Sequence, residues 1–249
     1  MAGVDAARFA CAVPGTAGPS YSDGKYWKLR YTEKTFEPFE WYLKWEQIKE
    51  IVAPLLTAES EVLVLGCGTS LLPEQLLAEG LAAQVTCVDQ CAELIEALKQ
   101  KYADKAGLQF EHLSAQQLPQ DWAQRFDLVL DKAMLDCVLS GRQARPRADE
   151  ILQAVSAVLK SSGSRYVLVS HARPEQRLHI LCQPSTDFSQ EYQWTVSRHK
   201  VPRPLAAGDA AAKGGKAKKG DDGLGGTLEA SAACNPEENA YHIYCCERE

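Results

Sequence analysis

Strand-like apolar runs alternate with helix-like segments through the middle of the chain, and this alternation limits the fold more than any other feature. The strand-like runs are residues 61–67, 83–89, 108–113, 126–132 and 164–171. The helix-like segments between them are 71–80, 91–103 and 147–163. Strands that alternate with helices at this spacing form a parallel sheet with helices on both faces. The sequence therefore predicts an α/β fold.

The alternation stops after residue 171. Residues 191–202 and 240–248 are both strand-like, and the segment between them is not helix-like. That segment includes 206–233, which holds seven of the 17 glycines and cannot form a core. We expect a disordered insertion at 206–233 and an antiparallel pair of strands on either side of it, which gives seven strands in all.

Composition restricts the chain to a single globular domain with appendages. It has 249 residues, 45% of them apolar, and a net charge of −6, which argues against general nucleic-acid binding. No apolar run approaches the roughly 20 residues that span a bilayer. Residues 1–20 are a loose leader without the pattern of a secretory signal. We expect a cytoplasmic protein without nucleic-acid or membrane partners; import into an organelle is the alternative.

The nine cysteines do not form a metal-binding pattern. Several lie in apolar runs, among them Cys67 and Cys87, which is typical of buried reduced thiols. Cys245 and Cys246 are adjacent and have no CxxC partner. We therefore expect no metal site.

Paired glycines end the first strand-like run, in the stretch "VLVLGCGTS" at 62–70. In an open α/β sheet a ligand binds beyond the carboxyl ends of the strands, where Gly66 and Gly68 fall. A P-loop is excluded because the required lysine is missing, and Leu71 stands where a dinucleotide-binding motif has its third glycine. A structural turn alone is the alternative explanation.

An acidic residue ends the second strand-like run and narrows the choice of ligand. Asp89 follows Gly66 by 23 residues, and a carboxylate there can accept hydrogen bonds from both ribose hydroxyls of a nucleoside. Asp89 can also cap the helix that follows, and the two roles are compatible. The pattern favours a nucleoside ligand that needs no pyrophosphate site, and S-adenosylmethionine fits this description.

Three further stretches resemble a known family. "YWKLRY" at 26–31 resembles a YWxxRY motif, "FEWY" at 39–42 an acidic-Trp-aromatic element, and "FDLVLDKAMLDCVL" at 126–139 a fourth-strand motif with D/E-K-G-T-L-D. Residues 21–249 thus resemble a class I, Rossmann-like, seven-strand S-adenosylmethionine-dependent methyltransferase domain with a C-terminal antiparallel hairpin. The similarity is narrowest with the branch of elongation factor 1-alpha and citrate synthase lysine methyltransferases.

The resemblance implies a role for particular residues. Trp27, Tyr31 and Trp41 would form walls of the cofactor pocket, where ring faces attract the sulfonium charge; ordinary core packing is the alternative. The residues implied at the strand ends are Gly66 and Gly68 beside the methionine and ribose, Asp89 at the ribose, Gln90, Ser114 and Ala115 at the adenine, and Lys132 on the cofactor side. Ser114 replaces the usual Asp, and Ala133-Met134 replaces Gly-Thr.

Two charged residues complete the predicted site. Arg30 is a candidate for a forked contact to the cofactor carboxylate; a side chain that only faces solvent is the alternative. Asp131 is the candidate catalytic residue, because a carboxylate can orient the amine of an attacking lysine. The implied partner is a lysine-containing protein, with a translation elongation factor as one candidate. A small-molecule methyltransferase and a non-catalytic scaffold protein are the alternatives, and Leu71 and the terminal hairpin disfavour a dehydrogenase.

Overall fold

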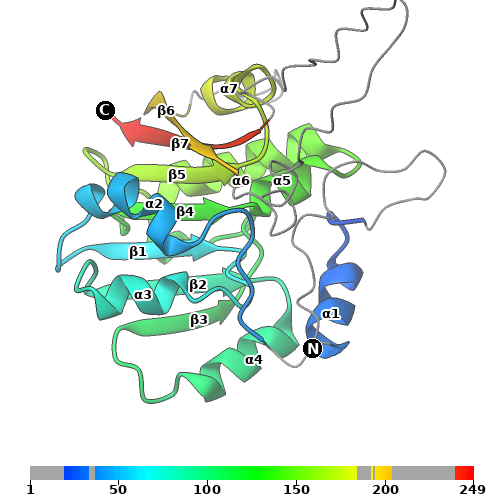
Figure 1. Ribbon diagram of the computed structural model, residues 1–249, viewed down its shortest axis with the longest axis vertical. Coiled ribbons are helices and arrows are strands. Elements are labelled where there is room, and N and C mark those ends of the chain that lie inside the picture. Colours follow the sequence, from blue (N-terminus) through cyan, green and yellow to red (C-terminus); the bar gives the residue numbers. More distant parts are fainter. Residues whose placement is uncertain (1–19, 34–36, 184–191, 193, 204–238) are drawn as a thin grey trace, which may run out of the picture. The chain divides into compact units, whose positions relative to one another are not determined.

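A computed structural model describes residues 20–33, 37–183, 192, 194–203 and 239–249. Seven strands form one sheet in the order β3-β2-β1-β4-β5-β7-β6 (Figure 1). The strands are β1 (Glu61–Leu65), β2 (Gln84–Asp89), β3 (Leu108–His112), β4 (Leu128–Lys132), β5 (Arg165–Ser170), β6 (Trp194–Pro202) and β7 (Ala240–Arg248). The first five pair in parallel, and β7 pairs antiparallel with β5. This confirms the predicted fold class.

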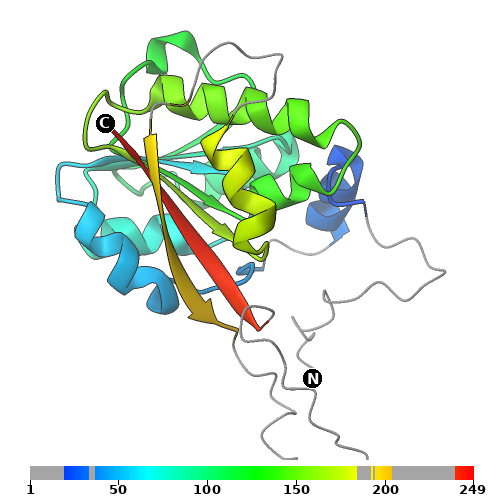
Figure 2. The same cartoon turned by 90° about the horizontal axis from the view of Figure 1, so that it is seen from above.

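Helices lie on both faces of the sheet, and Figure 2 shows the two layers. The helices are α1 (Gly24–Glu33), α2 (Trp45–Val52), α3 (Leu72–Ala78), α4 (Ala92–Lys101), α5 (Met134–Leu139), α6 (Ala144–Val158) and α7 (Pro174–Cys182). Two 3-10 turns occupy Ala53–Leu55 and Gln120–Trp122. Sequence analysis predicted α3, α4 and α6 but missed α5 and α7.

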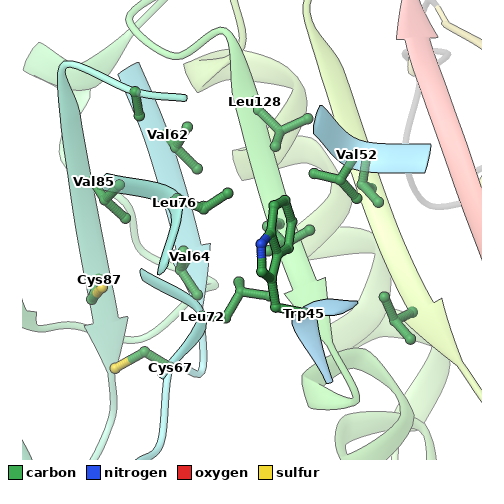
Figure 3. Packing of buried hydrophobic residues seen from close by; sticks show 14 of the residues in the cluster. Trp45, Val52, Val62, Val64, Cys67, Leu72, Leu76, Val85, Cys87 and Leu128 are labelled. Carbon is green, nitrogen blue, oxygen red and sulfur yellow. The ribbon is translucent and has the colours of Figure 1, made fainter. Parts of the chain in front are cut away.

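One hydrophobic core lies between the sheet and helices α2, α3 and α4. Val62 and Val64 of β1 point to this face because alternate residues of a strand share a face. They pack with Trp45 of α2 and with Leu72 and Leu76 of α3, as Figure 3 shows. Burial of each such side chain contributes about 1.5–3 kcal/mol, so this layer fixes the helix that follows the glycine turn.

A second core lies on the opposite face, under helices α5, α6 and α7. Leu63 and Leu65 of β1 point to this side and are fully buried. Their partners include Ile151 and Leu152 of α6 and Leu135 of α5. Because both faces of β1 are buried, the run at 62–65 is continuously apolar rather than alternating.

The strand order reverses between β1 and β4, where α/β sheets of this kind bind ligands. β1 pairs with β2 on one side and with β4 on the other, so the carboxyl ends of these three strands meet at one edge of the sheet. The predicted leader at 1–20, apart from residue 20, and the predicted insertion at 206–233 lie outside the described residues. In the described ranges no helix is long and apolar enough to cross a membrane.

Candidate functional site

A cavity opens at the carboxyl ends of β1, β2 and β4. Eleven residues that the sequence singled out for cofactor binding line it: Trp27, Arg30, Tyr31, Trp41, Gly66, Gly68, Asp89, Gln90, Ser114, Ala115 and Lys132. They come from six separate stretches of the chain, so the fold brings together motifs that are far apart in the sequence. The predicted catalytic residue, Asp131, is not among the lining residues.

The glycine turn forms the floor of the cavity. Gly66 has φ +56° and Gly68 has φ +53°, a conformation that disfavours any residue with a Cβ. A Cβ on Gly66 would lie 2.7 Å from Cγ of Met134, and one on Gly68 would lie 2.9 Å from the hydroxyl of Tyr31. Both glycines are therefore required by backbone conformation and by the close approach of neighbouring side chains, which gives a physical basis for the motif.

Asp89 stands at the end of β2, and its carboxylate is held by backbone groups. The N–H of Gly68 donates to Oδ2 at 3.1 Å, and the N–H of Cys91 donates to Oδ1 at 3.0 Å. Burial raises the pKa of Asp89, and the two backbone hydrogen bonds partly offset this effect. The carboxylate is thus fixed in direction at the cavity wall, as a group that binds two ribose hydroxyls must be.

Aromatic rings from α1 and from the loop that precedes α2 cover the cavity. The rings of Trp27 and Trp41 lie 5.7 Å apart at 62°, and those of Trp27 and Tyr31 are stacked with centroids 6.0 Å apart. The guanidinium of Arg30 lies 4.8 Å from the centre of the Phe39 ring, which also lines the cavity. A cationic ligand would thus meet ring faces, which attract positive charge.

A buried ion pair holds this cover in place. Lys132, at the end of β4, places Nζ 2.8 Å from Oε2 of Glu40 and donates to the carbonyl of Trp41 at 3.1 Å. Glu40 also accepts the hydroxyl of Ser70 at 2.8 Å and the N–H of Leu71 at 2.7 Å. Burial lowers the pKa of Lys132, and the charge of Glu40 opposes that effect. Lys132 therefore lines the cavity, but its ammonium is directed to Glu40.

The end of the cavity near β3 is formed by Gln90, Ser114 and Ala115, the residues expected at an adenine. The hydroxyl of Ser114 accepts the N–H of Gln116 at 3.3 Å, so it stabilises the turn that follows β3. Arg147 and Ile151 of α6 line the same cavity. The sequence did not indicate a cavity role for these two residues. The apolar spacing of α6 predicts only a helix that packs against the core.

Comparison with known proteins identifies the family. A family model described as a methyltransferase domain matches residues 56–221, which is more than half of the chain. The chain belongs to this methyltransferase family. It is 30% identical over 179 residues to EEF1A lysine methyltransferase 4 of Mus musculus, covering 68% of this chain and 69% of that protein. It is also 29% identical over 173 residues to a mitochondrial citrate synthase-lysine N-methyltransferase of Danio rerio, covering 61% of this chain and 68% of the relative.

A solved structure shows the same fold for this methyltransferase. The N-methyltransferase NodS of Bradyrhizobium japonicum, in complex with S-adenosyl-L-homocysteine, superposes with a TM-score of 0.50. It covers 92% of this chain and 95% of its own, at 13% sequence identity. At this level of identity the likeness concerns the fold alone.

S-adenosylmethionine is the cofactor that the methyltransferase cavity fits. The backbone at Gly66 and Gly68 is accessible because neither residue carries a Cβ. Asp89 supplies a carboxylate whose orientation is set by two N–H donors. Trp27 and Trp41 supply ring faces on the same cavity wall. These are the three recognition elements that a nucleoside with a sulfonium and no phosphate requires.

The geometry contradicts the catalytic role expected for Asp131 in the methyltransferase. Its side chain is fully buried, and its carboxylate accepts the N–H of Met134 at 2.8 Å, the N–H of Leu135 at 3.1 Å and the hydroxyl of Tyr166 at 3.1 Å. Burial raises the pKa of Asp131 to about 7, against the effect of these hydrogen bonds. Asp131 therefore stabilises the start of α5 and does not reach a substrate amine.

Two functional features of the methyltransferase escaped the sequence. Glu40 was quoted within "FEWY" and Lys132 within the fourth-strand motif, but only the structure shows that they pair. Met134 and Cys137 of α5 also line the cavity, next to the left-handed Ala133 with φ +78°. Their apolar side chains make the rim between β4 and α6. Within the described ranges no cluster of metal-ligating side chains occurs.

Proposed function

We propose that this methyltransferase transfers a methyl group from S-adenosylmethionine to a lysine side chain of a protein, with an elongation factor 1-alpha-like protein as the first candidate. One observation carries the proposal. The aromatic residues of "YWKLRY" and "FEWY" meet Gly66, Gly68 and Asp89 in a single cavity. The names of the relatives at about 30% identity support lysine as the acceptor. The proposal includes a cytoplasmic location.

The residues that would hold the cofactor follow from their positions along the cavity. Asp89 would accept the ribose hydroxyls, and Gln90, Ser114 and Ala115 would contact the adenine. The guanidinium of Arg30 would bind the carboxylate as a fork, which is the geometry that this side chain provides. Glu40 and Lys132 act indirectly, because their ion pair fixes the loop that carries Trp41.

The bound cofactor supplies an activated methyl group, so the protein need not form a covalent intermediate. Its task is to align the acceptor nitrogen with the methyl carbon and to exclude water. Trp27, Trp41 and Phe39 are suited to both, because rigid rings fill space and attract the sulfonium by roughly 0.5–2 kcal/mol when desolvated. Met134 and Cys137 provide an apolar rim that a lysine stem can contact.

The test is methyl transfer to protein in a mixture of potential substrates. Purified protein is incubated with S-adenosylmethionine labelled on the methyl group, either with a cell lysate or with purified elongation factor 1-alpha, and the labelled proteins are hydrolysed to amino acids. We expect labelled methyl-lysine from at least one protein band. Asp89→Ala is the matched control and should lower incorporation with both samples. Label found only in small molecules would replace the proposal with a small-molecule methyltransferase, and no label in any fraction would favour a scaffold.

A further inference from the structure

A cluster of polar side chains lies next to the cavity at the end of β5, a strand that the cofactor residues do not use. It consists of Tyr42 in the loop before α2, Asp136 on α5, Ser170 and His171 at the end of β5, and Arg177 on α7. β5 neighbours β4 on the side away from β1 and β2. The cluster therefore extends the row of strand ends in the direction opposite to Asp89 (Figure 1).

The imidazole of His171 has a defined orientation. Its Nδ1 lies 2.6 Å from Oδ2 of Asp136 and 2.8 Å from the hydroxyl of Tyr42. The Tyr42 hydroxyl donates to the same Oδ2 at 3.1 Å, and the backbone N–H of His171 donates to it at 3.0 Å. Because Nδ1 faces a carboxylate, we assign the proton of the neutral ring to Nδ1. Nε2 is then left with a lone pair that can accept a proton.

Asp136 is suited to hold this ring because it stays ionised. Burial opposes the charge, but the hydrogen bond from His171 and the charge of Arg177 outweigh it and keep the pKa of Asp136 below its ordinary value. Arg177 lies 2.7 Å from Oδ1, and Ser170 donates to the same oxygen at 2.7 Å. Oδ1 of Asp136 therefore binds the structural partners Arg177 and Ser170, whereas Oδ2 binds Tyr42 and His171.

The cluster differs from a buried structural network in two respects. The side chain of His171 is 53% exposed, whereas those of Asp136 and Arg177 are 2% and 5% exposed. The backbone of Tyr42 has φ +61°, which is strained for a bulky residue. Such strain persists only where surrounding contacts impose it, and it is common at functional sites.

Two connections join the cluster to the cavity. Tyr42 follows Trp41, which lines the cavity, and their rings are 6.0 Å apart. Cys137, another lining residue, follows Asp136 on α5. The cluster thus borders the cavity on the side of the apolar rim, where a substrate side chain can enter without displacing a group bound at Asp89.

We propose that His171 accepts, on Nε2, the proton that the target ammonium must lose before methyl transfer, and that Asp136 and Tyr42 hold its imidazole in position. In this step an N–H bond of the ammonium breaks, its electron pair stays on the lysine nitrogen, and the proton forms a bond with Nε2. The exposed ring then releases the proton to solvent. The inference rests on the proposed function, because it presupposes a lysine acceptor.

Neutral lysine is scarce without such a base. With an ordinary pKa of about 10.4, only about one lysine in 10³–10⁴ is neutral at pH 7. Histidine ordinarily changes charge between pH 5 and 8, so it can accept and release a proton at working pH. Asp131 and Glu40 do not fill this role, because both are engaged in hydrogen bonds that stabilise the fold.

The test compares His171→Gln with wild type by the initial rate of methyl-lysine formation in a lysate from pH 6.5 to 9.5. Asp136 and Tyr42 contact the imidazole directly, Arg177 pairs with Asp136, and Tyr241 stacks on Tyr42. Burial raises the pKa of Tyr42 and raises that of the nearby Cys137 to about 12, so neither group titrates in this pH range. We expect a loss of about 10²–10³-fold at pH 7, in the range of general-base catalysis. The loss should shrink as pH rises, because solution then supplies neutral lysine.

Two controls separate a catalytic role from a structural one. His179→Gln changes an exposed histidine of α7 outside the cavity and should keep the wild-type rate at every pH. Affinity for S-adenosylhomocysteine, measured by calorimetry, should be the same in His171→Gln and wild type. Tyr42→Phe removes one contact to Nδ1 and should lower the rate at pH 7 by about 3- to 30-fold, a smaller loss within the range of orienting contacts.

The outcomes are distinguishable. A rate for His171→Gln within 3-fold of wild type at pH 7, or a deficit that stays constant with pH, would overturn the inference while leaving the proposed function intact. If wild type forms no methyl-lysine although it binds S-adenosylhomocysteine, the proposed function fails and the inference fails with it. Loss of cofactor affinity in His171→Gln would show that the ring only supports the fold.

Discussion

The carboxyl ends of the strands form a row along one edge of the sheet. The buried carboxylates at the two ends of this row are held by different kinds of contact. At the end formed by β1 and β2, Asp89 is fixed by the backbone N–H groups of Gly68 and Cys91, which are 21 and two residues away. At the end formed by β4 and β5, Asp136 is held mainly by side chains, among them those of Tyr42 and Arg177, which are 94 and 41 residues away. We call these the cofactor end and the substrate end.

The difference indicates how each end can vary. Backbone contacts at the cofactor end require only the glycines and Asp89, so a short motif specifies them. Side-chain contacts at the substrate end require several compatible residues at once, and a change in one alters the fit of the others. A family can therefore keep the cofactor end and change its substrate by altering the other end.

The carboxylates of Asp131 and Asp136 show the same contrast within one segment. Both are buried at the substrate end, but burial dominates for Asp131 and raises its pKa to about 7, whereas His171 and Arg177 keep the pKa of Asp136 below its ordinary value. Asp131 bonds mainly to backbone N–H groups at the start of α5. The number of positive partners, rather than the degree of burial, decides the charge of each group.

The largest expected effect is at the joint between the two ends, the ion pair of Glu40 and Lys132. Glu40→Gln leaves the Lys132 ammonium buried without its counter-charge, which should lower the free energy of unfolding by about 2–4 kcal/mol. Chemical denaturation monitored by circular dichroism measures this loss. The double variant Glu40→Gln/Lys132→Met is the control, and it should recover a large part of the stability because no unpaired charge remains.

If the single and double variants were equally unstable, the ion pair of Glu40 and Lys132 would not be the contact that stabilises the fold between the two ends. The loss would then come from the hydrogen bonds of Ser70 and Leu71 to Glu40. A double-mutant cycle over Glu40 and Lys132 separates the two explanations, because only a direct pair gives a coupling energy.

A second prediction concerns the close approach of the Met134 side chain to Gly66, where an added Cβ would lie 2.7 Å from Cγ of Met134. Gly66→Ala should destabilise the fold by about 2–3 kcal/mol, because left-handed backbone alone costs roughly 1–2 kcal/mol and the new Cβ meets Met134. Gly80→Ala is the matched control, because Gly80 has a similar φ of +68° but a Cβ added there would have no heavy atom within 4 Å. Denaturation should give it a smaller loss of roughly 1–2 kcal/mol; equal losses would show that the Met134 contact contributes nothing.

A third prediction uses the opposite pKa shifts of the two carboxylates. The folded pKa of Asp131 lies above its unfolded value, so its ionisation removes stability as pH rises from about 4 to about 7. Relative to wild type, Asp131→Asn should therefore gain on the order of 2–3 kcal/mol between pH 4.5 and pH 7.5, because asparagine does not titrate. Urea denaturation at both pH values measures this change.

Asp136→Asn is the matched control for that experiment. The folded pKa of Asp136 lies below its unfolded value, so its stabilising effect is present above pH 4 and is lost as pH falls through the folded pKa. Its deficit relative to wild type should shrink only in acid and should not change between pH 4.5 and 7.5. A parallel pH dependence of the two variants would contradict the assigned charge states.

The cofactor end could be predicted from the sequence because its determinants are local. A strand that ends in Gly66 and Gly68, followed by a strand that ends in Asp89, implies a fixed position relative to the sheet edge. The structure places all three on the cavity, together with Gln90 and the aromatic residues of the two N-terminal motifs. Their roles toward the cofactor stay predictions until binding is measured.

The substrate end could not be predicted, for physical reasons. Helix α5 has only six residues, too few for an apolar period to show, so Asp131 was not recognised as its N-terminal partner. Tyr42 and His171 are 129 residues apart, and nothing in either local sequence indicates the other. Which of the two acidic residues Asp131 and Asp136 contacts His171 depends on the direction of α5, which only the fold determines.

The most direct test of the account is calorimetric titration of S-adenosylhomocysteine into wild type, Asp89→Ala and His171→Gln. If the cofactor binds at one end and proton transfer occurs at the other, Asp89→Ala should weaken binding by about 1–3 kcal/mol, the scale of lost hydrogen bonds to a charged group. His171→Gln should bind as wild type does. Unchanged affinity in Asp89→Ala would contradict the assignment of the cofactor end.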